Sequence, residues 1–129
     1  MKKKRVKRPT GKLTRDQIKN LDTLWRDVVI ARANGQCEHC LSTKVLQAHH
    51  IQSRFYYQTR WLLENGACLC RGCHYTFAHR DFLGFYFWIR ERRNVSTIWT
   101  AMKSQPNTKN RDYQGIRLYL EQQLKNIRG

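Results

Sequence analysis

The feature that most constrains this chain is the placement of its cysteines and histidines. All five cysteines and all five histidines fall between Cys37 and His79, and the rest of the 129 residues carry neither type. Two Cys-x2-Cys pairs frame the segment, Cys37 with Cys40 and Cys70 with Cys73. Four thiolates in two such pairs are what a closed tetrahedral zinc site requires. We therefore predict a structural Zn²⁺ that ties the beginning of this segment to its end.

Two side chains of the same segment are predicted to stay out of the zinc site. Cys68 alternates with Cys70 along a predicted strand, so its thiol should point into the core as a small apolar group. His39, inside the first pair, is predicted to be a surface residue rather than a fifth ligand. Disulfides are the alternative to zinc, but the N-terminus has no secretory signal pattern, and a reducing compartment disfavours them.

The charge balance indicates a polyanionic partner. Lysines and arginines number 25 against nine acidic residues, which gives a formal net charge of +16. A compact chain with this charge repels itself unless a polyanion shares its surface, and nucleic acid is the first candidate. Residues 1–12 are predicted to be a basic flexible arm that lies along a phosphate backbone when DNA is present. The arm residues expected to contact DNA are Lys2, Lys3, Lys4 and Arg5.

A membrane partner is not expected. The longest apolar run, Phe82 to Ile89, is far shorter than the ~20 residues that cross a bilayer. The charged N-terminus is not followed by an apolar stretch. The sequence therefore predicts a cytoplasmic protein.

One domain is predicted over residues 13–129, since the length allows one modest core. Residues 13–35 are predicted to form an N-terminal helix. Thr14 and Gln17 are typical of a capping box, and apolar residues recur at helical spacing after them, among them the core candidate Trp25.

The rest of the domain is predicted to combine two short strands with helices. Strands are expected at 45–51 and 66–70, with a helix beginning near Cys70. These elements belong to a zinc-bound core over residues 37–79. Residues 80–129 are predicted to form a helical C-terminal extension, with helices at 82–93, at 96–104 and from an N-cap at Asn110 onward.

A second group of polar residues lies inside the zinc segment. His49 and His50 are adjacent on the first predicted strand, Asn65 precedes the second, and His74 follows the last zinc cysteine directly. Together, Ala-His-His-Ile, Glu-Asn-Gly and Cys-Leu-Cys-Arg-Gly-Cys-His resemble the HNH endonucleases. The resemblance covers residues 37–79 and is to the four-cysteine zinc branch that is common among small phage-encoded enzymes.

The resemblance implies an α+β fold with a ββα-metal core, in which two strands and a helix surround one catalytic divalent ion. By position, His49 and His74 resemble the metal ligands and His50 the general base. Asn65 resembles the motif's asparagine, which orders the loop and helps to hold the base. An imidazole titrates near neutral pH, so His50 can accept a proton from the attacking water. The resemblance also implies a bacterial or phage-infected cell.

The catalytic ion and its further ligands stay open at this point. Two imidazoles leave most coordination positions to water and phosphate, which fits Mg²⁺ or Mn²⁺ first and also Ni²⁺ or Zn²⁺. His79 lies five residues after His74, about 140° around an α-helix, which is a poor position for a second helical ligand. A helix break near Ala78 would bring it inward.

Arginines near the motif are candidates for a DNA footprint. Arg54, just after the first strand, resembles an arginine of the phage enzymes that grips the backbone near the cut, and a plain surface cation is the alternative. Arg60 and Arg71 are weaker candidates for phosphate contacts.

These features predict a metal-dependent DNA endonuclease that nicks or cuts by hydrolysis. A zinc-stabilised DNA-binding module with an inactive site is a second hypothesis. A third is an accessory subunit of a phage packaging or recombination complex, motivated by the apolar helix at Phe82 to Ile89. The oligomeric state and the preferred DNA are left open by the motifs.

Overall fold

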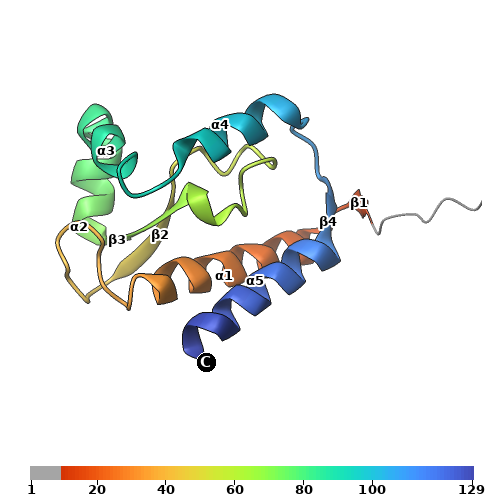
Figure 1. Cartoon of the computed structure of the whole chain (residues 1–129), viewed down its shortest axis with the longest axis horizontal. Coiled ribbons are helices and arrows are strands. Elements are labelled where there is room, and N and C mark those ends of the chain that lie inside the picture. The colour runs from red at the N-terminus through yellow and green to blue at the C-terminus, as the bar shows by residue number, and fades with distance from the viewer. Residues whose placement is uncertain (1–9) are drawn as a thin grey trace, which may run out of the picture.

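The computed structural model describes residues 10–129, and the four arm residues Lys2, Lys3, Lys4 and Arg5 lie outside the described range. The predicted α+β class is confirmed, with helices around two small antiparallel strand pairs (Figure 1). In chain order the elements are β1 (Thr10–Lys12), α1 (Arg15–Arg32), β2 (Leu46–His50), the 3-10 turn η1 (Leu63–Asn65), β3 (Gly66–Cys70), α2 (Arg71–Cys73), the π-helix η2 (His74–His79), α3 (Phe82–Ile89), α4 (Val95–Ser104), β4 (Asn110–Asp112) and α5 (Tyr113–Arg128).

The N-terminal helix begins at the predicted capping box. The Thr14 hydroxyl accepts a hydrogen bond from the backbone N–H of Gln17 at 3.1 Å, and the Gln17 side chain accepts one from the N–H of Thr14 at 3.0 Å. The two bonds satisfy amide groups that a helix start otherwise leaves unpaired. Trp25 is buried on the inner face of α1, as predicted. Helix α5 runs alongside α1 and covers part of the same core (Figure 1).

The β2–β3 hairpin divides the core into two parts. The strands pair antiparallel, with His50 opposite Gly66 and Leu46 opposite Cys70. Alternation along β3 sends Cys68 toward α1 and α5, whereas Ala67 and Leu69 pack against η2 and α3. Cys68 is therefore the core residue that the sequence predicted, and burial raises the pKa of its thiol to about 11.

Gly66 lets the hairpin approach α1 closely. A Cβ at this position would lie 2.6 Å from Val29 Cγ2 and 2.8 Å from Trp25 Cζ2, so a larger residue would push strand and helix apart. The Gly66 carbonyl accepts hydrogen bonds from Arg32 and Arg93. The end of β2 that carries His50 is thereby fixed against α1.

The start of the described chain belongs to a strand pair that the sequence did not predict. Thr10–Lys12 form β1 and pair with Asn110–Asp112 as β4, so the last three residues of the arm expected over 1–12 are a strand, and the rest of that arm lies outside the described residues. Asn110 was predicted to cap the last helix, but it lies in β4. The cap of α5 is Asp112, whose carboxylate accepts from the N–H of Gly115 at 2.9 Å.

Helix α3 is shorter and less enclosed than predicted. It ends at Ile89 rather than near Arg93, because the Arg93 guanidinium turns back to Gly66 and Glu38. Phe85 and Ile89 are buried, whereas other apolar side chains of the helix are exposed. No helix in residues 10–129 combines the length and apolar character needed to cross a membrane.

Candidate metal centres and the histidine cleft

The two Cys-x2-Cys pairs meet where the hairpin enters α2. The sulfur atoms of Cys37, Cys40, Cys70 and Cys73 all lie within 4.8 Å of one another. Backbone N–H groups of Cys40 and Cys73 donate to the sulfurs of Cys37 and Cys70 at 3.5 and 3.4 Å. A tetrahedral zinc ion with bonds of ~2.3 Å holds its sulfurs ~3.8 Å apart, and the 3.5 Å between the Cys40 and Cys70 sulfurs is close to this value.

The electrostatics of this cluster also fit a bound cation. Burial raises the pKa of Cys37, but hydrogen bonds from nearby backbone amides outweigh it and lower the pKa to about 7. Burial and the three neighbouring thiols raise the pKa of Cys73. Sulfurs this close cannot all ionise without a positive charge between them, which a zinc ion supplies.

His39 is exposed, as predicted, but it is not independent of the cluster. Its Nδ1 lies 3.4 Å from the Cys73 sulfur. The ring stacks on Phe77 with centroids 4.0 Å apart and meets the edge of Trp88 at 5.3 Å. His39 therefore covers one side of the cysteine cluster and links it to η2 and α3.

Three imidazoles converge on the other side of η2. His49 Nδ1 and His79 Nε2 each lie 3.1 Å from His74 Nε2, and the ligand atoms of the three residues lie within 4.8 Å of one another. Two nitrogens bound at ~2.0–2.1 Å to one ion, at an angle near 100°, are ~3.2 Å apart. The described side chains therefore fit a shared divalent ion.

The position of His79 corrects the sequence reasoning. An α-helix separates residues five apart by about 140°, and on that geometry His79 was a poor ligand. The segment His74–His79 is instead a π-helix, whose hydrogen bonds run from residue i to i+5. The wider turn brings His74 and His79 to one face.

Gln47 is a residue of the site that the motifs did not identify. Its side-chain oxygen contacts Nδ1 of His74. Because an amide oxygen only accepts, Nδ1 carries the proton, and the lone pair of Nε2 points toward His49 and His79. Metal-binding histidines commonly have such a second partner, which fixes their tautomer and orientation. The only signal in the sequence is that Gln47 precedes His49 by two residues and so shares its face of β2.

The environment keeps His49 and His74 unprotonated. Burial, reinforced by the neighbouring imidazoles, lowers the pKa of His49 to about 3. The pKa of His74 is lowered by the same two causes. Neutral imidazoles with converging lone pairs are available to a cation at neutral pH.

His50 faces the opposite side of β2. Its ring stacks on Trp25 with centroids 3.9 Å apart and planes 11° apart. Nε2 lies 2.9 Å from the backbone carbonyl oxygen of Arg60, which only accepts, so this nitrogen carries the proton. Nδ1 is left with a lone pair, and burial lowers the pKa of His50 to about 4. His50 is thus held in place and neutral at pH 7, but burial makes it a weaker base than the imidazole titrating near neutral pH that the sequence led us to expect.

Asn65 holds the loop whose Arg60 carbonyl accepts from His50. The fully buried amide accepts from the N–H of Gln52 at 2.7 Å and donates to the carbonyls of Gln52 and Thr59, both at 3.0 Å. All its hydrogen-bonding atoms are engaged on the loop. Asn65 therefore acts as a positioning residue in this fold.

Arg60 is engaged inside the protein. Asp22 of α1 accepts from its Nε and Nη2 at 2.9 and 2.7 Å, and also from Trp61 Nε1 at 2.9 Å. Arg60 Nη1 donates to the carbonyl of Arg54. These bonds fix the backbone opposite His50, and we do not propose Arg60 as a DNA contact.

Side chains from both faces of the hairpin line one cleft at the end of β2. His49, His50, His74, His79 and Arg54 line this histidine cleft, which has a volume of about 490 Å³. None of the described residues that line it is acidic. An adjoining hollow beside His74 and His79 is lined by Gln47 and by Arg71, which is exposed.

No protein-family model, curated protein sequence or solved structure matches this chain. A four-cysteine cluster and a histidine triad in a small α+β fold are therefore the basis for any functional conclusion. Chemically, this arrangement can hold two ions, one enclosed by sulfur and one at an open cleft beside an imidazole that accepts protons.

Proposed function

We propose that this chain is a metal-dependent endonuclease of the HNH type, which hydrolyses phosphodiester bonds of DNA at the histidine cleft. One observation carries the proposal. His50, with a free lone pair on Nδ1, lines the same cleft as the three converging imidazoles. An ion site beside a general base, open to a substrate, is what metal-assisted hydrolysis requires.

The order of elements supports the family assignment. A two-stranded hairpin leads directly into the helical segment α2–η2, which corresponds to the ββα-metal arrangement that the sequence motif implied. His49 belongs to the first strand and His74 to the helical segment. The cysteine cluster joins the same two parts, so a structural zinc ion would hold the ligands in register.

Each side chain of the histidine cleft has its own role in the proposed hydrolysis. A divalent ion held by His49, His74 and His79 supplies a positive charge that neutralises the scissile phosphate. His50 takes one proton from a water molecule, whose oxygen forms a bond to phosphorus. The bond from phosphorus to the 3′ oxygen breaks, which leaves a 5′-phosphate and, after protonation from solvent, a 3′-hydroxyl. Arg54 is placed to pair with the phosphate.

The third imidazole changes which ion is expected. Mg²⁺ and Mn²⁺ prefer oxygen ligands, whereas imidazole suits Ni²⁺ and Zn²⁺ better. We therefore propose Ni²⁺ or Zn²⁺ at this site ahead of Mg²⁺, and Mn²⁺ as a weaker-binding transition metal that the site also accepts. DNA is the proposed partner because the chain is strongly basic and no described acidic residue lines the cleft.

Plasmid cleavage by two matched histidine variants tests the proposal. The wild type should nick or linearise plasmid when Mn²⁺ or Ni²⁺ is added. His50→Ala should lower the rate about 10²–10⁴-fold while binding the ion as tightly as the wild type, because only the base is lost. His79→Ala should lose ion affinity as well as cleavage. Calorimetry measures ion binding, and zinc content in both variants controls for folding.

Two results would contradict the proposal. Cleavage at the wild-type rate by His50→Ala would remove the base from the mechanism. A zinc-loaded wild type that binds DNA and the divalent ion but never cuts would favour the DNA-binding module instead.

A second candidate function is a subunit that cuts only beside a partner protein. Leu83 and Phe87 on α3 expose 67% and 55% of their surface, which is unusual for large apolar side chains on one helix. This candidate predicts that the isolated chain binds DNA and the ion without cutting, and that cutting appears with the partner.

A further inference from the structure

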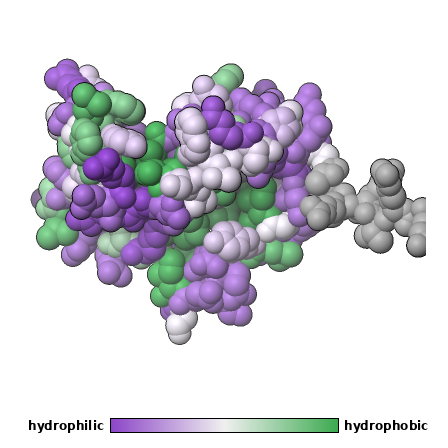
Figure 2. Space-filling view, turned by 45° about the horizontal axis from the view of Figure 1, so that its top comes forward, coloured by the Kyte–Doolittle hydropathy of each residue, from purple (hydrophilic) through white to green (hydrophobic). Residues whose placement is uncertain are grey.

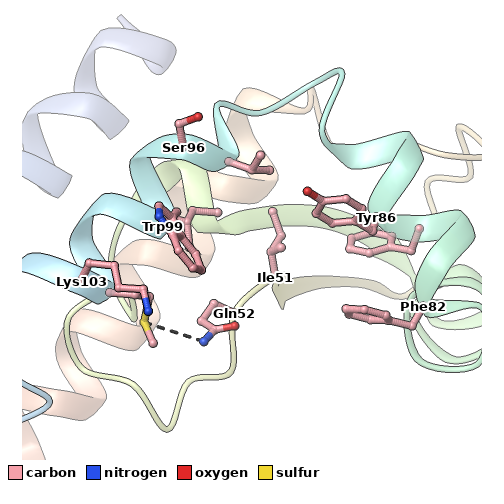
Figure 3. Close-up of a pocket in the computed structure, with 11 residues that line it drawn as sticks. Ile51, Gln52, Phe82, Tyr86, Ser96, Trp99 and Lys103 are labelled. Carbon is pink, nitrogen blue, oxygen red and sulfur yellow. Dashed lines mark hydrogen bonds between the residues drawn. The ribbon is translucent and has the colours of Figure 1, made fainter.

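A second groove adjoins the histidine cleft, between α3 and α4. It has a volume of about 540 Å³, within the range of about 300–1,000 Å³ that is usual for small-molecule sites. Phe82 and Tyr86 of α3 and Trp99 of α4 lie on either side of Ile51 (Figure 3). Figure 2 shows apolar surface in the hollow between the lobes that carry α3 and α4. We call this the aromatic groove.

The aromatic groove and the histidine cleft are continuous. Ile51, Phe82 and Phe85 line both. Phe85 also meets the ring of His49 edge-on, with centroids 5.1 Å apart. The two spaces therefore form one continuous surface that leads from the triad into the groove.

The aromatic side chains of the groove are available for stacking. The side chain of Trp99 is 65% exposed and that of Phe82 is 63% exposed. Exposed aromatic rings in a groove are the usual platform for unpaired bases, since every base has a flat face.

Charge and polar groups in the groove also suit a nucleotide. Lys103 is the only charged residue among the described residues that line it, and its Nζ lies 4.4 Å from the centre of the Trp99 ring. The cation lies over one face of the ring, so a base stacks on the opposite face, or takes this face once the flexible lysine moves to a phosphate. Gln52, whose backbone is held by Asn65 on both sides, presents its amide at the floor of the groove (Figure 3).

We infer that the aromatic groove receives an unstacked nucleobase of the DNA strand beside the scissile phosphate, with Trp99 as the stacking platform. The inference rests on the proposed function and specifies its substrate class, which is DNA with unpaired nucleotides next to the cut. In a fully paired duplex the base must first leave the stack, which costs a few kcal/mol. Substrates that are already unpaired avoid this cost.

Binding to two oligomers of equal charge tests the inference. One is a short oligothymidylate, and the other has the same length and phosphates but only abasic sites. Fluorescence anisotropy at fixed salt, with protein that carries a single zinc ion per chain and no added divalent ion, measures affinity without cleavage. The wild type should prefer the oligothymidylate, and Trp99→Ala should weaken that complex about 5- to 150-fold while leaving the abasic complex unchanged.

Matched variants separate stacking from folding. Trp99→Phe should restore most of the affinity, because it keeps a stacking ring. Tyr119→Ala removes an aromatic residue on α5 that is 55% exposed and lies outside the groove, and it should have no effect on either oligomer. Equal wild-type affinity for the two oligomers, or a Trp99→Ala loss that is the same for both, would overturn the inference. Equal wild-type affinity for the two oligomers is also the result expected if the groove holds a protein segment instead.

Failure of the inference is distinct from failure of the proposed function. Plasmid cleavage with Mn²⁺ tests the histidine cleft, and base-dependent binding tests the aromatic groove. In cleavage, a duplex with a central unpaired bubble should be cut in the bubble faster than its fully paired counterpart. Trp99→Ala should remove this preference, and a preference that survives in Trp99→Ala would also overturn the inference.

Discussion

Gln47 shows how a single side chain outside the motif can determine what the motif does. By accepting a hydrogen bond from Nδ1–H of His74, it directs the Nε2 lone pair toward His49 and His79. Without that contact the ring could take the other tautomer or rotate away. The residue therefore belongs to the candidate ion site although it touches no ion.

Replacing Gln47 tests this role. Gln47→Leu removes the acceptor and should weaken divalent-ion binding about 10- to 100-fold, because the His74 ring is no longer oriented. Gln47→Glu keeps an acceptor and should bind the ion at least as tightly as the wild type. Isothermal titration of zinc-loaded protein with Mn²⁺ measures both. Unchanged affinity in Gln47→Leu would mean that His74 is oriented by packing alone.

At the residue scale, the sequence identified the site in large part but not completely. The spacing of the cysteines predicted the four-sulfur cluster, and the resemblance pointed to His49 and His74, which the fold brings together. Gln47 was missed because glutamine in a strand carries no local signal. The roles of His50 and Arg54 stay predictions until cleavage is measured.

At the scale of elements, the π-helix η2 is the feature that completes the triad. Its wider turn places His74 and His79 on one face at a spacing of five, where an α-helix needs four. Local sequence could not reveal this, because residues 74–79 contain neither Gly nor Pro and their pattern suits a regular α-helix equally well. In contrast, local patterns predicted both hairpin strands to within one residue and the capped helix α1 to within three residues at each end.

Shortening η2 by one residue tests the importance of the spacing. Deleting Thr76, which is exposed, leaves the two histidines four apart in a segment that can become regular α-helix. The variant should keep zinc and bind Mn²⁺ within a few-fold of the wild type. Inserting an alanine after Thr76 should abolish Mn²⁺ binding. Loss of Mn²⁺ binding in the folded deletion variant would show that the π-helix itself is required.

At the scale of the whole molecule, two layers supply different parts of the site. In the first layer, α1 and α5 bury Trp25, which stacks on His50. In the second layer, η2 supplies His74 and His79 and packs against α3. The layers meet because β2 ends at His50, where the cleft opens. The strand pair β1–β4 closes the chain between residues 10 and 112, a pairing too distant in sequence to be predicted from either strand alone.

The most direct test of the central claim follows ion occupancy and DNA cleavage in one Mn²⁺ titration of zinc-loaded protein. We predict one bound Mn²⁺ per chain and a single-turnover cleavage rate that rises with the same dissociation constant. His50→Ala should give the same binding curve without cleavage. A cleavage rate that reaches its maximum at Mn²⁺ concentrations too low to occupy the site would contradict the account. So would unchanged Mn²⁺ binding in a variant with alanine at His49, His74 and His79.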